Sequence, residues 1–405
     1  MKLAYFVHDL TDPAVARRVR MLRAGGAEVV LLGFRREADP PAEVAGVRPV
    51  DLGRTYDARL GHRAALTALS VLGAGRLRQH LAGCDVVMAR MLESLAVAAA
   101  ARRLSGLRTR FVYECLDVHR LMLGEGAKSR AMRAGERALL RGIDLLVVSS
   151  PAFLREYFEP RQGVGGQIPL PTLLVENKVL DLEPLGDRHA EPARPVGPPW
   201  RIGWLGAIRC RRSLAILSDL AARRPDLIEV RIRGRPAYSE FDDFDAQVAG
   251  RPNLTFGGGY AAADLPRVYG EVHFAWAIDF MEEGLNSSWL LPNRLYEASR
   301  YGAVPIALAG VETGRYLAAR GFGLRLTDTA EFERALERLT PEAYADLAAQ
   351  LARISPDAFV AGPDDCRRLV ENLAGERAGA PASRAPRQQP RKGVSSPEHI
   401  HGEAV

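Results

Sequence analysis

Cysteine is scarce in this chain of 405 residues, and the few cysteines present exclude two kinds of site. They are spread over the whole sequence, at Cys84, Cys115, Cys210 and Cys366. No two of them form a Cys-x-x-Cys pair, the usual spacing in zinc sites and redox motifs. Neither a structural zinc site nor a disulfide framework is therefore indicated, and we expect four buried, reduced thiols.

Long apolar runs are also missing. A helix that spans a membrane needs ~20 consecutive apolar residues, and no stretch of the chain approaches that length. Segment 1–8 reaches a charged residue directly after a short apolar core, so it is better explained as a first β-strand than as a secretory signal. With 47% hydrophobic and 26% charged residues, the composition is that of a soluble globular protein, and we expect a cytoplasmic one.

Basic residues outnumber acidic ones only in the N-terminal part of the chain. Residues 1–180 hold 27 Lys and Arg against 18 Asp and Glu, whereas the remainder holds 28 against 31. Part of the excess lies in the stretch 54–80, where Arg59, Arg63, Arg76 and Arg78 flank an Ala- and Leu-rich helical pattern. This segment either rests on an anionic membrane surface or is the solvated face of a helix. Nucleic acid fits less well, because no aromatic residues interleave the basic ones.

Short apolar runs alternate with helical patterns along most of the chain, which predicts α/β architecture with parallel sheets and crossover helices. The expected strands are 3–7, 28–32, 85–88, 110–113 and 145–148, then 201–206, 228–232, 254–256, 272–277 and 304–308. Helices are expected at 14–24, 94–104 and 129–141. At 405 residues the chain is too long for one compact core, so two domains are expected.

The domain boundaries follow from composition. Residues 1–180 form one Rossmann-like, doubly wound domain, and a proline-rich stretch, 181–200, is a linker. Residues 201–374 form the second such domain, whose last helix could cross back to the first. The tail 375–405 is rich in Pro, Arg, Gln and Ser and is predicted to be disordered. Two such domains place a ligand cleft between them, at the carboxyl ends of their strands.

The most informative motif runs from Asn286 to Ala307. A polar turn with Asn286 and Ser287 precedes a helix that carries Arg294 and Glu297, and a short apolar strand follows. The start of such a helix offers free N–H groups to a phosphate or diphosphate, and Arg294 could add a charged donor. Glu297 would repel phosphate and is better suited to the hydroxyl pair of a ribose. The motif therefore predicts a nucleotide, held by its diphosphate and by its sugar.

Four segments together resemble the retaining GT-B glycosyltransferases of family 4, in the branch that builds succinoglycan-type exopolysaccharides. They are Leu-Pro-Asn-Arg-Leu-Tyr-Glu at 291–297, Gly-Trp-Leu-Gly-Ala-Ile-Arg-Cys-Arg-Arg-Ser at 203–213, Tyr-Glu-Cys-Leu-Asp-Val-His at 113–119, and the opening segment 8–18. The resemblance covers roughly residues 1–373 and implies a GT-B fold, in which two Rossmann-like domains face each other across a cleft.

The resemblance implies roles on the donor side. Glu297 would hold the ribose of a nucleotide-sugar donor, a UDP- or GDP-sugar, and Arg294 would lie near its phosphates. After Gly206, Arg209 and Arg212 would neutralise the leaving diphosphate, so that no metal and no cofactor is expected. The acidic cluster 242–245 is then interpreted as a solvated helix rather than a metal site.

The resemblance also implies roles at the reacting centre. The sugar's configuration would be retained, with the departing phosphate taking the proton of a lipid-linked or oligosaccharide acceptor. Asp117 and His119 match the family's His-Asp region only approximately, because Leu116 stands where the histidine usually stands. The residues expected to contact the acceptor lie in the first domain: Asp9, Asp12, Arg17 and Arg90.

One position departs from the family pattern. The family's second carboxylate, eight residues before Glu297, is Trp289 here. Trp289 either stacks on a sugar face or packs in the core. Glu283, Asn286 and Ser287, in the preceding loop, could take over the missing hydrogen bonds to the transferred sugar, and Asp279 is another candidate at the cleft.

Two functions remain open from the sequence. The first is a cytoplasmic glycosyltransferase, peripheral on the inner face of the plasma membrane if the basic segment binds lipid. The second is a catalytically weak subunit that binds a nucleotide-sugar within a polysaccharide assembly complex. A sugar-nucleotide epimerase has the same two-domain shape. Phosphorylases of this shape need a pyridoxal-bearing lysine, and residues 180–391 contain no lysine.

Overall fold

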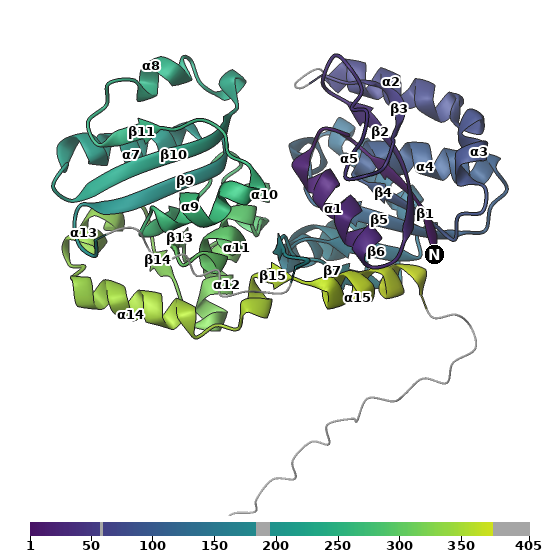
Figure 1. The fold of residues 1–405 in the computed structure, drawn as a ribbon. Helices are drawn as coiled ribbons and strands as arrows, with labels where there is room; N and C mark the ends of the chain where they lie inside the picture. The colour runs from purple at the N-terminus through teal and green to yellow at the C-terminus, as the bar shows by residue number, and fades with distance from the viewer. Residues whose placement is uncertain (57–59, 184–194, 376–405) are drawn as a thin grey trace, which may run out of the picture.

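The structure, a computed structural model, describes residues 1–56, 60–183 and 195–375. It contains two α/β domains side by side, each built on one parallel sheet with helices packed against it (Figure 1). The predicted GT-B type of architecture is confirmed. Arg59, most of the proposed linker and the proposed disordered tail from residue 376 lie outside the described residues.

The N-terminal domain has a seven-stranded parallel sheet in the order β3-β2-β1-β4-β5-β6-β7. Its strands are β1 (Lys2–Val7), β2 (Glu28–Arg35), β3 (Val50–Arg54), β4 (Val86–Arg90), β5 (Arg110–Cys115), β6 (Leu145–Val148) and β7 (Thr172–Leu174). Its helices are α1 (Pro13–Ala24), α2 (Leu60–Leu72), η1 (Ala74–Leu77), α3 (Arg78–Leu81), α4 (Leu92–Leu104), η2 (Arg120–Met122), α5 (Ala127–Leu140), α6 (Pro151–Phe153) and the π-helix η3 (Leu154–Gln162). All five strands expected here are confirmed, while the edge strands β3 and β7 were not predicted.

The C-terminal domain has a six-stranded sheet in the order β11-β10-β9-β12-β13-β14. Its strands are β9 (Trp200–Ile208), β10 (Ile228–Pro236), β11 (Leu254–Phe256), β12 (Phe274–Trp276), β13 (Val304–Leu308) and β14 (Leu324–Leu326). Its helices are α7 (Arg211–Arg223), η4 (Tyr238–Glu240), α8 (Phe244–Val248), η5 (Ala262–Asp264), α9 (Leu265–Gly270), α10 (Asn286–Trp289), α11 (Asn293–Arg300), α12 (Glu312–Arg320), α13 (Glu331–Glu337) and α14 (Pro341–Ala352). The acidic cluster 242–245 lies at the start of α8, where Asp243 caps the helix and Asp242 pairs with Arg211.

The end of the described chain returns to the N-terminal domain (Figure 1). After η6 (Pro356–Ala358), strand β15 (Val360–Ala361) pairs with β8 (Val179–Leu180), and α15 (Pro363–Ala374) packs against α1. The apolar face of α15, formed by Cys366, Leu369, Val370 and Leu373 at helical spacing, is buried in the same cluster as β1 and α1. Gly25 permits this close approach, since a Cβ there would lie 2.2 Å from the carbonyl oxygen of Cys366. The last helix therefore belongs to the core of the first domain.

All four cysteines are free and buried, as expected. Among the described residues, none of the helices combines the length and the apolar character that crossing a membrane requires.

A buried charge cluster lies at the centre of the N-terminal sheet. Glu114 on β5 accepts hydrogen bonds from Nε of Arg18 and Nε of Arg90, each at 2.7 Å, and from the hydroxyl of Tyr5 at 2.5 Å. None of the side chains of Glu114, Arg90 and Arg18 is more than 3% exposed. Burial alone would raise the pKa of Glu114, but Arg90 and Arg18 outweigh it and lower this pKa to about 2. The cluster ties α1 to the middle strands of the sheet.

We predict that Glu114→Gln lowers the free energy of unfolding by about 3–5 kcal/mol, because two buried guanidinium groups lose their counter-charge. Glu28→Gln is the control, since Glu28 pairs with Lys2 at the surface and should cost less than about 1 kcal/mol. Because the folded pKa of Glu114 lies below its ordinary 4.5, its contribution is present above pH 4.5 and is lost as the pH falls toward 2. Urea unfolding of both variants measures this, and equal losses would contradict the assigned role of the cluster.

Candidate active site between the two domains

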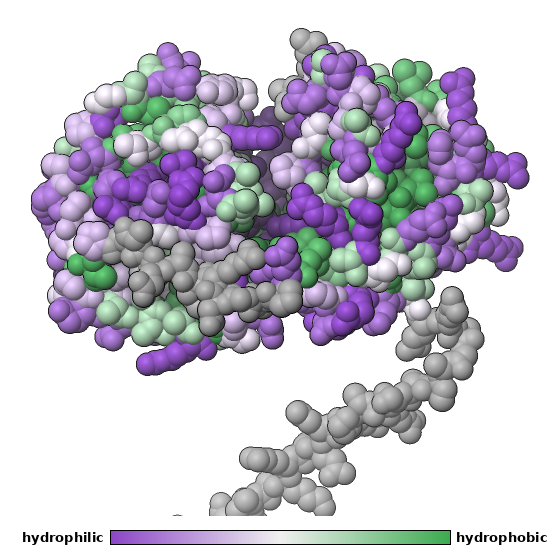
Figure 2. Space-filling model, in the orientation of Figure 1, coloured by the Kyte–Doolittle hydropathy of each residue, from purple (hydrophilic) through white to green (hydrophobic). Residues whose placement is uncertain are grey.

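The surface is hollowed between the two domains (Figure 2), and two loops meet at this cleft. One follows β5 in the N-terminal domain, and the other follows β12 in the C-terminal domain. The backbone N–H of Val118 donates to Oδ1 of Asn286 at 3.3 Å, which joins them directly. Both loops leave the carboxyl ends of their strands, the edge at which open α/β sheets bind ligands.

The predicted nucleotide motif forms α11 and β13. Pro292 occupies the N-cap of α11 with extended dihedrals, φ −72° and ψ 152°, so the helix begins at Asn293. Arg294 donates to the carbonyl oxygen of Ala207 at 3.1 Å and to that of Trp276 at 3.4 Å. The guanidinium therefore lies across the ends of β9 and β12, beside the N-terminus of the helix.

Glu297 lies one turn further along α11 and is partly buried. The hydroxyl of Tyr269 donates to its Oε2 at 2.8 Å. Burial raises the pKa of Glu297, while Tyr269, Arg17 and Arg294 act in the opposite direction. The carboxyl group is thus held at the sheet edge near two guanidinium groups, a suitable place for a hydrogen-bonding partner of hydroxyl groups.

The loop after β9 carries Arg209, and the first turn of α7 carries Arg212; both were predicted to bind a diphosphate. The close approach of β9 and β10 before this loop depends on Gly206, which adopts φ +95°, and on Gly234 of β10, where a Cβ would lie 1.9 Å from the carbonyl oxygen of Gly206. Nη2 of Arg209 lies 3.0 Å from Oδ2 of Asp279, and Nη1 of Arg212 lies 2.8 Å from Oε2 of Glu283. Burial would lower the pKa of Arg209, but Asp279 raises it overall. A diphosphate would therefore compete with two carboxylates for these guanidinium groups.

This pairing was not predicted. Asp279 and Glu283 were expected to contact the transferred sugar, and the structure places both on the arginines. The guanidinium of Arg212 also lies 4.1 Å from the centre of the Phe280 ring. Ser287 accepts from the backbone N–H of Glu282 at 3.1 Å and so shapes the same loop.

Asp117 and His119 extend from the N-terminal domain toward these groups. The protein atoms around the cleft partly desolvate the Asp117 carboxyl and thereby raise its pKa, although the side chain itself is exposed. Arg209, His119 and Asn286 oppose this and lower the same pKa. A raised pKa makes this carboxylate a better proton acceptor. Nδ1 of His119 accepts from the N–H of Leu121 at 3.2 Å, and burial lowers the pKa of the ring, with Arg63 adding to the effect. The lowered pKa favours the neutral ring, and because Nδ1 accepts a hydrogen bond, Nε2 is then left as a donor.

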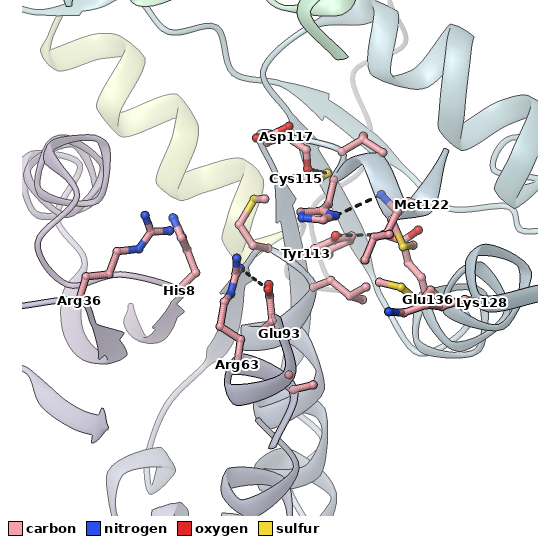
Figure 3. A pocket seen from close by; sticks show the side chains of 18 residues that line it. His8, Arg36, Arg63, Glu93, Tyr113, Cys115, Asp117, Met122, Lys128 and Glu136 are labelled. Atoms are coloured by element: carbon pink, nitrogen blue, oxygen red, sulfur yellow. Dashed lines mark hydrogen bonds and ion pairs between the residues drawn. The ribbon is translucent and has the colours of Figure 1, made fainter. Parts of the chain in front are cut away.

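A cavity of about 380 Å³ opens beside Asp117 and His119, within the N-terminal domain (Figure 3). Its apolar wall consists of Met91, Leu92, Val118, Leu121, Met122 and Met132. Polar groups surround this wall. Glu93 is paired with Arg63, and Glu136 accepts from the Tyr113 hydroxyl at 3.1 Å. Several lining residues directly follow a strand, such as His8, Arg36 and Met91, and position after a strand is the signal that could have identified them.

None of the four residues expected to contact an acceptor lines this cavity, although Asp9 pairs with Arg36 and Asp12 with His8, which do. Asp9 accepts from the N–H and hydroxyl of Thr11, Asp12 caps α1, and Arg90 is buried in the Glu114 cluster.

Arg17 reaches the second domain instead, and its guanidinium lies 3.5 Å from Oδ1 of Asn293 at the start of α11. Burial, with Arg18 and Arg90, lowers the pKa of Arg17 to about 10, and Glu297 opposes this shift. Arg17 therefore faces the helix that carries Arg294 and Glu297.

Trp289 is only 9% exposed and belongs to the same buried apolar cluster as Ala152 and Phe153 of the N-terminal domain. Its carbonyl oxygen accepts from the hydroxyl of Ser150 at 2.6 Å. Of the two interpretations, packing fits this geometry better than stacking on a sugar. The residue anchors the loop of one domain in the core of the other.

Residues 12–167 match the family model described as "Glycosyl transferase 4-like domain". The chain is 48% identical over 380 residues to the succinoglycan biosynthesis protein ExoL of Rhizobium meliloti (strain 1021), covering 92% of this chain and 93% of that protein.

Solved structures with little sequence identity share the fold. The chain is similar to a sucrose-phosphate synthase from Thermosynechococcus elongatus, with a TM-score of 0.63, 15% identity and coverage of 92% and 96% of the two chains. It is also similar to the apo form of the lipopolysaccharide outer core galactosyltransferase WaaB, with a TM-score of 0.55, 16% identity and coverage of 92% and 97%.

We predict that Trp289→Ala lowers the free energy of unfolding by about 3–5 kcal/mol, because it removes a large buried side chain between the domains. Trp289→Phe should retain most of the stability. Nucleotide affinity should change little, since the side chain packs in the apolar cluster of the N-terminal domain. Chemical denaturation and calorimetry measure both quantities. A variant with full stability but impaired sugar transfer would instead support stacking on the sugar.

Proposed function

Since the chain belongs to the glycosyl transferase 4-like family of glycosyltransferases, we propose that it transfers a sugar from a UDP- or GDP-sugar to a lipid-linked or oligosaccharide acceptor. We further propose that this step serves the synthesis of a succinoglycan-type exopolysaccharide, the process named for the relative from Rhizobium meliloti. One observation carries the proposal: Arg294, Glu297 and the arginines after β9 converge at one sheet edge, opposite Asp117.

On the donor side, the diphosphate would lie at the N-terminus of α11, and Glu297 would accept hydrogen bonds from the ribose. The partial positive charge of the helix start favours the phosphates. When the sugar leaves, negative charge develops on the diphosphate. Arg209 and Arg212 are already fixed beside the loop after β12 and would stabilise that charge by exchanging their carboxylate partners for phosphate oxygens. We propose that these arginines take the place that a metal ion has in other transferases.

On the acceptor side, the cavity beside Asp117 would receive the terminal sugar of the acceptor. Its volume of about 380 Å³ lies within the range of small-molecule pockets, and its carboxylates and histidines suit sugar hydroxyls. The attacking hydroxyl would then emerge next to Asp117 and His119. Retention of configuration, with the departing phosphate as the base, rests on the family resemblance alone.

We predict that Arg212→Ala slows transfer about 100-fold while weakening binding of the nucleoside diphosphate much less, because the charge it meets is largest in the transition state. Arg211→Ala is the matched control. Its guanidinium pairs with Asp242, away from the loop after β12, so transfer should be unaffected. The donor is first chosen by thermal shift with uridine, guanosine and adenosine diphosphates and their sugars.

Three outcomes of this assay count against parts of the proposal. Binding without turnover for every donor and extract-derived acceptor would indicate a binding subunit. Loss of transfer in EDTA, restored by magnesium or manganese, would contradict the metal-free proposal. An inverted linkage in the product, measured by nuclear magnetic resonance, would contradict retention and favour Asp117 as a general base.

We also propose that the protein is a peripheral one on the cytoplasmic face of a membrane, through α2. The outer face of this helix exposes Leu69 by 64% and Leu72 by 81%, and the exposed Arg76 and Arg78 follow it. Figure 2 shows apolar side chains over the part of the N-terminal domain where Figure 1 places α2. Exposed leucines beside arginines suit an anionic lipid surface.

We predict that the protein floats with vesicles containing anionic lipid and that the double variant Leu69→Gln, Leu72→Gln loses most of this binding. Leu104→Gln, which alters another exposed leucine of the same domain, should bind like the unaltered protein. High salt should release the protein, since the arginines act through screened charge. Equal flotation of all three proteins would remove α2 as the membrane contact.

A further inference from the structure

A buried tyrosine lies directly behind Glu297, the carboxylate that we propose holds the ribose. Tyr269 on α9 is fully buried, and its hydroxyl donates to Oε2 of Glu297 at 2.8 Å. Tyr260, in the loop after β11, lies near enough for Glu297 and Tyr269 to shift the pKa of its hydroxyl. Of the two tyrosines, Tyr269 contacts the carboxylate through a hydrogen bond, and neither was singled out in the sequence.

The ring of Tyr269 is fixed by its surroundings. It belongs to a buried cluster with Leu205 of β9, Val268 and Ala298 of α11. The ring of Tyr301 stacks against it with centroids 6.3 Å apart and planes 19° apart. Because the ring cannot easily turn, its hydroxyl holds one oxygen of Glu297 in a fixed position and leaves the other oxygen for a ligand.

The charge state of Glu297 depends on few groups. Tyr269 on α9, Tyr260 on the preceding loop, Arg17 on α1 and Arg294 on α11 itself face the carboxyl. Burial raises the pKa of Glu297, and the hydrogen bond from Tyr269 is the first of the opposing effects. A ribose that donates two hydroxyl groups needs the ionised carboxylate, because a protonated carboxyl loses acceptor capacity.

We propose that Tyr269 is a positioning residue for the donor nucleotide: its hydroxyl fixes Glu297 in the orientation that accepts the ribose hydroxyls. This rests on the proposed function, in which Glu297 holds the ribose. Tyr269 itself would not touch the substrate. Its effect passes through the carboxylate, which distinguishes it from a residue that merely fills the core.

The test is Tyr269→Phe, which keeps the ring and removes the hydroxyl. Calorimetry with uridine and guanosine diphosphates, from about pH 5 to about pH 8, should show binding weakened about 5- to 30-fold near neutral pH. Affinity should decline toward acid as Glu297 takes up a proton. Without the hydroxyl the pKa of Glu297 rises, so this decline should begin at higher pH than in the unaltered protein.

Tyr157→Phe is the matched control, because Tyr157 donates to the buried Glu136 in the N-terminal domain at 2.5 Å. It removes a similar buried bond and should leave nucleotide affinity and its pH dependence unchanged.

The variant Glu297→Ala distinguishes failure of the ribose role of Glu297 from failure of the positioning role of Tyr269. If Glu297→Ala binds nucleotide normally, the ribose role in the proposed function fails. If Glu297→Ala weakens binding but Tyr269→Phe keeps the affinity and pH profile of the unaltered protein, the positioning role alone is overturned. A uniform loss in Tyr269→Phe, with no shift of the acid limb, would also overturn it.

Discussion

The geometry of the whole cleft depends on one constraint: the loop 277–292 of the C-terminal domain is held from both sides. The N-terminal domain fixes its far end, where Trp289 is buried among that domain's apolar side chains and Asn286 accepts from Val118. Its own domain fixes its near end through Asp279 and Glu283, which pair with Arg209 and Arg212. Because α11 begins directly after this loop, the same contacts set the distance from Arg294 and Glu297 to Asp117.

The two parallel sheets determine where the other loops of the cleft lie. In both domains the strands are parallel, so their following loops gather at one edge, and α15 secures the second domain's chain to the core of the first. Arg294 and Glu297 then lie on the wall formed by the second domain, and the cavity lies in the first. The arginines of the first domain are also divided between the cleft and the core. Arg17 crosses from the first domain toward Glu297, whereas Arg18 and Arg90 remain buried on Glu114.

Much of the fold followed from local patterns, because buried parallel strands are continuous apolar runs and crossover helices separate them. Helix α11 was also predictable, since Pro292, Arg294 and Glu297 lie within one short motif. Partners that come together only through tertiary contacts were not. Arg90 looked like a cleft residue because it ends a strand, yet its buried partner lies on the neighbouring strand β5. The partners of Arg209 and Arg212 are about 70 residues away, and the orientation of Trp289 depends on how the domains pack.

A crystal structure of the protein with the nucleoside diphosphate that stabilises it most would test the proposed donor site most directly. We expect ribose hydroxyls within hydrogen-bonding distance of Glu297, and a diphosphate at the start of α11 that contacts Arg209 or Arg212. A nucleotide bound in the N-terminal cavity, or one whose ribose lies away from Glu297, would contradict it.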